Sequence, residues 1–175
     1  MRQWPMRSPL AIRGAICEVH TGCEVQRRGS STPIVKDCFC EGLQALRKKD
    51  RKHIHAEDSN QLTGSVAIDK ALRTYYPNCN RWDYAVGYRH SNSQTDKVYF
   101  VEVHPASGKQ IKVILNKLAW LKQWLNNSAK TLNPLPKKFV WVSSSKVQIT
   151  PTSPQGKIVA QKGIVFAGRV LKIPK

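Results

Sequence analysis

The sequence predicts an α/β fold with a mixed central sheet flanked by helices. Two strand-like runs, residues 82–89 and 98–104, are apolar on both faces apart from isolated charged residues, as expected for strands that are covered on both sides. A long segment of helical periodicity follows them, and further strand-like runs follow that segment. The resulting order of helix, strand, strand, helix, strand, strand is typical of a compact α/β domain.

The chain of 175 residues is long enough for one hydrophobic core, and its composition suggests three parts. Residues 1–35 contain Arg, Ser, Gly, Thr and Pro without periodicity, which predicts a basic, flexible N-terminal arm. Residues 36–62 are expected to form a helical, basic connector. Residues 63–175 are expected to form the α/β domain itself.

The first predicted helix covers about residues 37–50. Asp37 is a suitable N-cap, Leu43 and Leu46 fall on one helical face, and a basic run follows at residues 47–52. Such a run is usually a solvated surface of a helix.

The second predicted helix covers residues 66–76, and Pro77 ends it. The two strands at 82–89 and 98–104 come next. The polar stretch 90–97 between them is suited to a hairpin turn.

The longest predicted helix covers about residues 107–126, with an apolar stripe at heptad-like spacing that should pack in the core. A strand is predicted at 138–143 and another at 164–173, with a short helix near 154–161 between them.

The net charge of +18 indicates a polyanionic partner. The chain has 29 Lys and Arg against 11 Asp and Glu, and residues 61–175 hold eighteen of the basic residues but only four acids. A positive field of this kind raises the local concentration of polyanions, of which nucleic acid is the commonest. A basic surface that serves solubility, anionic lipid or an acidic protein are the alternatives.

The sequence predicts a soluble, intracellular, cytoplasmic protein without a membrane partner. No apolar stretch approaches the eighteen or so residues of a membrane span, and no signal-peptide core follows Met1. Five cysteines make an odd number and favour reduced thiols. A zinc site is the alternative, although the spacing of its candidate ligands matches no common finger. These candidates are Cys17, His20, Cys23, Cys38, Cys40, His53 and His55.

Two acids are placed together if the strands at 82–89 and 98–104 pair as an antiparallel hairpin with Asn92-Ser93 at its tip. Asp83 then faces Glu102, and Arg89 faces Asp96. Side chains that face each other in this way can share a divalent cation, whereas two bare carboxylates would repel each other. Oxygen ligands favour Mg²⁺ or Mn²⁺, which can acidify a water molecule and neutralise charge on a phosphate.

The order of these residues resembles the PD-(D/E)XK nuclease superfamily, also called restriction-endonuclease-like. Asp69 lies on the second predicted helix, Asp83 opens a strand, and Glu102-Val-His104 lies in the next strand before the long helix. The resemblance covers about residues 63–173. It implies a restriction-endonuclease-like core with the α-β-β-α-β-β order given above.

The resemblance implies that Asp83 and Glu102 bind Mg²⁺ or Mn²⁺ and that Asp69 is an accessory acid. His104 takes the place of the superfamily's lysine, and Trp82 stands where its name has proline. Histidine is mostly neutral at pH 7 and can act as a base or a ligand but not as a standing cation.

A lysine from elsewhere in the chain can supply the missing positive charge, as in some relatives of the superfamily. Lys117 is the first candidate because it flanks the apolar stripe of the long helix, and Lys109 and Lys112 come next. Other roles remain open for the acids. Asp69 can be an ordinary solvated residue, and the partner that Glu102 needs in a buried strand can be a lysine in place of a metal.

The resemblance implies a metal-dependent nuclease that cleaves DNA, or structured RNA as the second choice. Lys109, Lys112, Arg81 and Arg89 are the predicted nucleic-acid contacts, and a homodimer fits the many relatives that cut duplexes as dimers. The main alternative is a catalytically inactive subunit of the same fold that binds nucleic acid or supports assembly. A third class is a basic protein-interaction or ribonucleoprotein component without a metal site.

Overall fold

The computed structural model describes residues 38–175 except 92, 94 and 131, so the predicted arm at 1–35 lies outside the described residues. A mixed six-stranded sheet forms the centre of the molecule, in the strand order β1-β3-β4-β5-β6-β7. This confirms the predicted α/β class with a mixed sheet. The six strands are β1 (Phe39–Cys40), β3 (Leu62–Ala67), β4 (Tyr84–Tyr88), β5 (Lys97–His104), β6 (Lys137–Ser143) and β7 (Ile164–Phe166).

The sheet is antiparallel from β1 to β5 and parallel from β5 to β7. The parallel step from β5 to β6 requires a crossover connection, and the long helix α4 (Ile111–Asn127) provides it. A second, two-stranded sheet pairs β2 (Ile54–Ala56) with β8 (Leu171–Ile173) in parallel.

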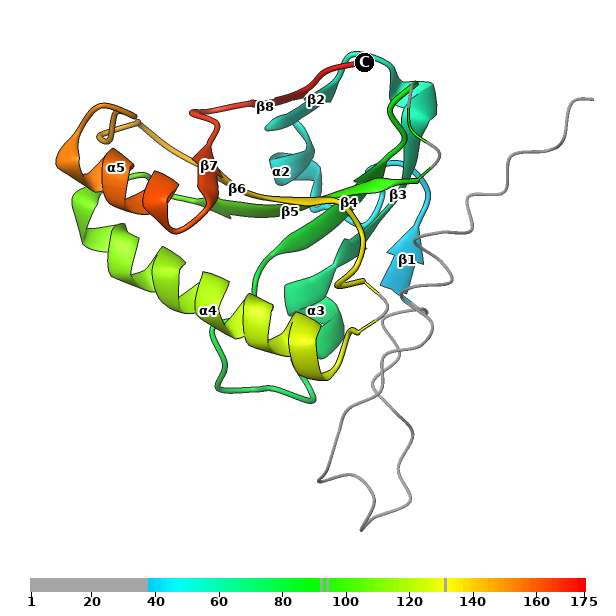
Figure 1. The fold of residues 1–175 in the computed structure, drawn as a ribbon, viewed down its shortest axis with the longest axis horizontal. Helices are drawn as coiled ribbons and strands as arrows, with labels where there is room; N and C mark the ends of the chain where they lie inside the picture. The colour runs from blue at the N-terminus through cyan, green and yellow to red at the C-terminus, as the bar shows by residue number, and fades with distance from the viewer. Residues whose placement is uncertain (1–37, 92, 94, 131) are drawn as a thin grey trace, which may run out of the picture.

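Helices cover one face of the central sheet, and a smaller layer covers the other (Figure 1). On the first face lie α3 (Ile68–Leu72), α4 and α5 (Pro154–Gln161), whose apolar side chains share one core with alternate residues of the strands. On the second face lie α2 (Lys48–Arg51) and the β2–β8 pair, around a second core. Because both faces are covered, every residue of β5 from Val98 to Val103 is buried.

The predicted hairpin register is correct. Tyr84 pairs with Val101 and Tyr88 pairs with Lys97, which is the register that places Asp83 opposite Glu102. At the other end of the hairpin the predicted pair of Arg89 with Asp96 is also present.

The long helix and the elements after it largely agree with prediction. A short 3-10 helix, η4 (Gly108–Gln110), precedes α4, and α5 and β6 lie where they were expected. The predicted strand at 164–173 is two separate strands, β7 and β8, because the chain turns at Gly168, whose φ of +67° favours glycine. Within the described ranges no helix is long and apolar enough to cross a membrane.

The helix predicted at 37–50 is wrong, although Asp37 itself lies outside the described residues. Phe39 and Cys40 form a strand that pairs with Val66 and Ser65, and only Lys48–Arg51 is helical. Strand pairing with a distant segment has overridden the local helical pattern.

The helix predicted at 66–76 is also wrong at both ends, because only Ile68–Leu72 is helical and Leu62–Ala67 is the strand β3. Strands on both sides bond to β3, which satisfies its backbone groups better than one turn of helix would. Gly64 in this strand has a φ of +146° and lies against the ring of Phe39, where a side chain would not fit.

Candidate functional site

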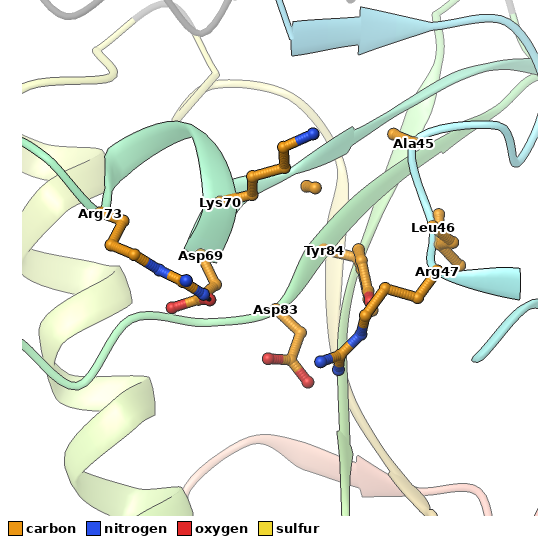
Figure 2. Close-up of a pocket in the computed structure, with 9 residues that line it drawn as sticks. Ala45, Leu46, Arg47, Asp69, Lys70, Arg73, Asp83 and Tyr84 are labelled. Atoms are coloured by element: carbon orange, nitrogen blue, oxygen red, sulfur yellow. Dashed lines mark hydrogen bonds and ion pairs between the residues drawn. The ribbon is translucent and has the colours of Figure 1, made fainter. Parts of the chain in front are cut away.

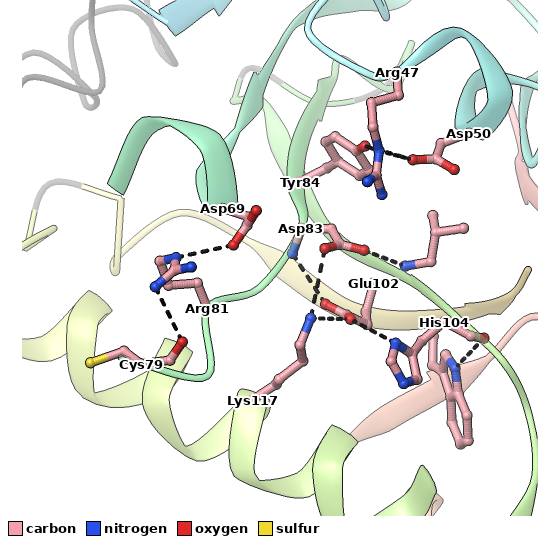
Figure 3. Close-up of polar contacts among 12 residues, drawn as sticks. Arg47, Asp50, Asp69, Cys79, Arg81, Asp83, Tyr84, Glu102, His104 and Lys117 are labelled. Atoms are coloured by element: carbon pink, nitrogen blue, oxygen red, sulfur yellow. Dashed lines mark hydrogen bonds and ion pairs between the residues drawn. The ribbon is translucent and has the colours of Figure 1, made fainter. Parts of the chain in front are cut away.

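Asp83 and Glu102 meet where the β4–β5 ladder ends. The backbone N–H of Asp83 donates to Oε2 of Glu102 at 3.1 Å, and the N–H of Val103 donates to Oδ2 of Asp83 at 3.0 Å. The last paired residues of the ladder are Tyr84 and Val101. Each carboxylate therefore accepts a backbone hydrogen bond just beyond the ladder, which fixes the two acids side by side (Figure 3).

Lys117 of α4 joins the two acids. Its Nζ donates a hydrogen bond to Oε1 of Glu102 and lies 3.6 Å from Oδ1 of Asp83. Core residues Ile114 and Leu118 on the same helix hold α4 against the sheet, so the lysine beside them reaches the end of β5. The buried partner of Glu102 is thus a lysine, which was one of the two partners expected from the sequence.

Burial makes both carboxylates hard to ionise. Glu102 has no exposed surface, and burial together with the charge of Asp83 raises its pKa to about 8, against the opposing effect of Lys117. Burial also raises the pKa of Asp83, opposed by Lys117 and by the N–H of Val103. At neutral pH the folded protein therefore holds a proton on Glu102.

His104 lies beside this pair. Its Nδ1 is 3.8 Å from Oε1 of Glu102, and its Nε2 is 2.8 Å from Oε1 of Gln110, just before α4. Its carbonyl oxygen accepts a hydrogen bond from Nε1 of Trp141 at 3.1 Å. Backbone and side chain are thus both held, and the imidazole is within reach of the acids.

Asp69 faces a pocket rather than Lys117. Its carboxylate pairs with Arg73 at 2.8 Å and with Arg81 at 3.0 Å. Its pKa is lowered because these two arginines outweigh the effect of partial burial. Its N–H donates to the carbonyl of Asp83 at 3.4 Å, and both acids line a pocket of about 400 Å³ (Figure 2).

The predicted nucleic-acid contacts form two different pairs. Lys109 and Lys112 are exposed at the start of α4. Arg81 and Arg89 are instead engaged inside the protein: the side chain of Arg81 is 10 % exposed and pairs with Asp69, whereas that of Arg89 is 19 % exposed and pairs at 2.6 Å with the buried Asp96. The two arginines therefore hold the fold together around the site and around the hairpin turn.

The sequence did not single out a second cluster beside the pocket. Asp50 is buried, and its Oδ2 accepts hydrogen bonds from the hydroxyl of Tyr84 and from Nε of Arg47, both at 2.7 Å (Figure 3). Arg47, Lys70 and Tyr84 also line the pocket with Asp83. The one signal in the sequence was Asp50, the only acid within the basic run 47–52.

The site contains two carboxylates side by side, which is fewer protein ligands than structural zinc takes. Within the described residues no three His, Cys, Asp or Glu side chains gather closely enough to hold a metal ion, whereas structural zinc takes four such ligands. Mg²⁺ is commonly held by one or two carboxylates and completes its shell with water and phosphate. Asp83 and Glu102 match that pattern. Cys17, His20 and Cys23 lie outside the described residues.

No family model, curated protein or solved structure matches the chain. The resemblance to the PD-(D/E)XK superfamily therefore depends on the spacing of the acids and the order of the elements around them. What the chain does has to be inferred from the geometry of Asp83, Glu102 and Lys117.

Proposed function

We propose that the protein is a metal-dependent nuclease that hydrolyses phosphodiester bonds, with DNA preferred to structured RNA and with Mg²⁺ or Mn²⁺ as its ion. The observation that carries this proposal is the convergence of Asp83, Glu102 and Lys117 at one end of the sheet. Two carboxylates and an ammonium group supply negative charge for a cation and positive charge for a phosphate. The net charge of +18 supports a nucleic acid as the substrate.

Each residue of the site has a role in this proposal. Asp83 and Glu102 would hold the ion, which when bound acidifies a water molecule and neutralises charge on the phosphate. Lys117 supplies the standing positive charge that His104 lacks. Asp69 is the accessory acid of this proposal and lines the pocket next to Asp83.

The state of Glu102 makes the proposed activity depend on pH. A carboxyl group with a pKa of about 8 must lose its proton before it can bind a cation. Affinity for Mn²⁺ should therefore rise by up to about tenfold per pH unit below pH 8, as expected when one proton is released on binding.

One observation favours a second function, that of an inactive nuclease-like subunit that binds nucleic acid or supports assembly. Glu102 is fully buried, does not line the pocket and keeps its proton at neutral pH, so the single positive charge of Lys117 balances the negative charge of Asp83. Charges balanced in this way need no metal. The protein would then bind nucleic acid without cleaving it.

Nicking of supercoiled plasmid DNA separates the two functions. With Mg²⁺ or Mn²⁺ the wild-type protein should nick the plasmid. Asp83→Asn and Glu102→Gln should each reduce the cleavage rate by about a hundredfold or more, which corresponds to an activation free energy several kcal/mol higher. Glu41→Gln, an exposed acid away from the site, is the matched control and should cleave normally. Circular dichroism checks that each variant is folded.

Two results would decide against the proposal. Full activity in both site variants would show that Asp83 and Glu102 are not the site. Tight DNA binding without cleavage of DNA or structured RNA, together with calorimetry in which Mn²⁺ fails to bind wild-type protein, would favour the inactive subunit.

A further inference from the structure

We propose that residues 47–52, here called the α2 basic segment, bind the phosphodiester backbone of a nucleic acid strand that enters the pocket at Asp83. This inference rests on the proposed function, because that function names nucleic acid as the ligand. It adds a binding surface that lies outside residues 63–173, the part of the chain that resembles a nuclease.

The α2 basic segment concentrates positive charge on the surface. Five of its six side chains are cationic and exposed, and the sixth, Asp50, is buried. Five positive charges and one negative charge give the segment a net charge of +4. The exposed residues are Arg47, Lys48, Lys49, Arg51 and Lys52.

The segment is held in place from inside. Asp50 accepts hydrogen bonds from Tyr84 and Arg47, and Arg51 donates to the carbonyls of Leu46 and Gln44 at 3.0 and 2.9 Å. A buried carboxylate is costly unless it is paired in this way. A run of cations that only kept the surface soluble would not need such an anchor.

The anchor places the segment at the rim of the pocket that contains Asp83. Arg47 and Leu46 line the pocket, and Tyr84, which bonds to Asp50, is the next residue after Asp83. The charged ends of Arg47 and Asp83 point toward one another (Figure 2). Arg47 of the α2 basic segment and Asp83 of the site therefore line the same pocket.

The charges around the pocket can accommodate a phosphate. Lys70 on α3 and Arg73 just after it line the opposite side of the pocket, so the two acids Asp69 and Asp83 lie among three cations that include Arg47. A phosphate above Asp83 would be repelled by the acids alone. Flanking cations offset that repulsion, and arginine matches the geometry of a phosphate with two parallel hydrogen bonds.

The test is the salt dependence of DNA binding, measured by fluorescence anisotropy with a short duplex in EDTA. Each phosphate contact contributes about 0.9 to the steepness of the plot of log K against log salt. We therefore expect the double variant Lys48→Gln/Lys49→Gln, which loses two contacts, to make that slope shallower by about 1.8. At about 0.1 M salt this corresponds to about 60-fold weaker binding. EDTA removes divalent metal ions, so binding is measured without cleavage. Failure of the proposed binding surface can then be distinguished from failure of the proposed nuclease activity.

The matched control removes two exposed lysines on the other side of the sheet, Lys130→Gln after the end of α4 and Lys157→Gln within α5. The control should change the slope much less, and unfolding midpoints should agree for all three proteins. Equal losses in both double variants would overturn the proposal in favour of a general charge effect. Competition by polyglutamate as strong as by DNA of equal charge would overturn it in favour of an acidic protein ligand.

Discussion

Replacing Glu102 by glutamine should change how the stability of the protein depends on pH. Glu102 is fully buried, and its pKa is raised from the ordinary 4.5 to about 8. Glutamine has nearly the same shape as a protonated glutamate but never ionises. The variant therefore resembles the low-pH form of the wild-type protein at every pH.

The sign of the effect follows from which state holds the proton. Between about pH 4.5 and 8 the folded wild-type protein keeps the proton on Glu102, whereas the unfolded chain has lost it. The stabilisation is complete below pH 4.5 and is lost as the pH rises through about 8. A change of 3.5 in pKa at about 1.4 kcal/mol for each unit gives a loss of about 5 kcal/mol. Asp83, whose pKa is also raised, acts in the same direction.

Urea unfolding of both proteins from pH 5 to pH 9 measures this difference. The free energy of unfolding of Glu102→Gln minus that of wild type should rise by about 4 kcal/mol over this range. A constant offset is also expected, because the glutamine amide replaces a carboxyl group that accepts hydrogen bonds from Lys117 and from the N–H of Asp83. Only the change with pH reports on ionisation of Glu102, and Glu41→Gln should give a difference that stays flat.

Parallel curves for wild type and Glu102→Gln, within about 1 kcal/mol over the whole range, would refute the reasoning. Such a result would mean that Glu102 is ionised in the folded protein at pH 5. Lys117 would then dominate over burial, and the proposed rise of Mn²⁺ affinity with pH would disappear as well.

The remaining predictions concern the fold around the site. Arg89→Met should destabilise the protein by about 3–5 kcal/mol in urea, because it leaves the carboxylate of Asp96 buried without its cation; a loss below about 1 kcal/mol would contradict this. Gly64→Ala should lower the midpoint of thermal unfolding, because the new methyl group would collide with the ring of Phe39 at a φ of +146°. Gly108→Ala has open space, and equal midpoints for the two variants would show that Gly64 is not strained.

Local patterns in the sequence were sufficient for the hairpin and the long helix. The strands β4 and β5 have strongly apolar sequences joined by a polar turn, and placing the tip of the hairpin at the middle of that turn gave the register that the structure shows. The heptad-like stripe of α4 marks its buried face in the same way. Because register and helix face were both predicted, the contacts of Asp83, Glu102 and Lys117 could be expected before the structure.

Local patterns were misleading where distant segments decide the conformation. Residues 37–50 and 66–76 both show helical periodicity, yet β1 and β3 pair with each other, and β3 also pairs with β4. Backbone hydrogen bonds between segments that are far apart in the chain outweigh a weak helical preference. No window of sequence contains both partners of such a pair.

The sequence by itself determined the class of fold, the facing acids and the excess of positive charge. The sequence also placed Arg89 opposite Asp96, but tertiary structure alone decided the roles of the other cations around the site. Arg81 pairs with Asp69, and the basic segment at 47–52 lies beside the pocket, where Asp50 and Tyr84 hold it. The physical reason is that the role of a charged side chain depends on which residues lie beside it in the folded protein. Burial and ion pairing depend on contacts across the sheet, and these contacts exist only once the chain has folded.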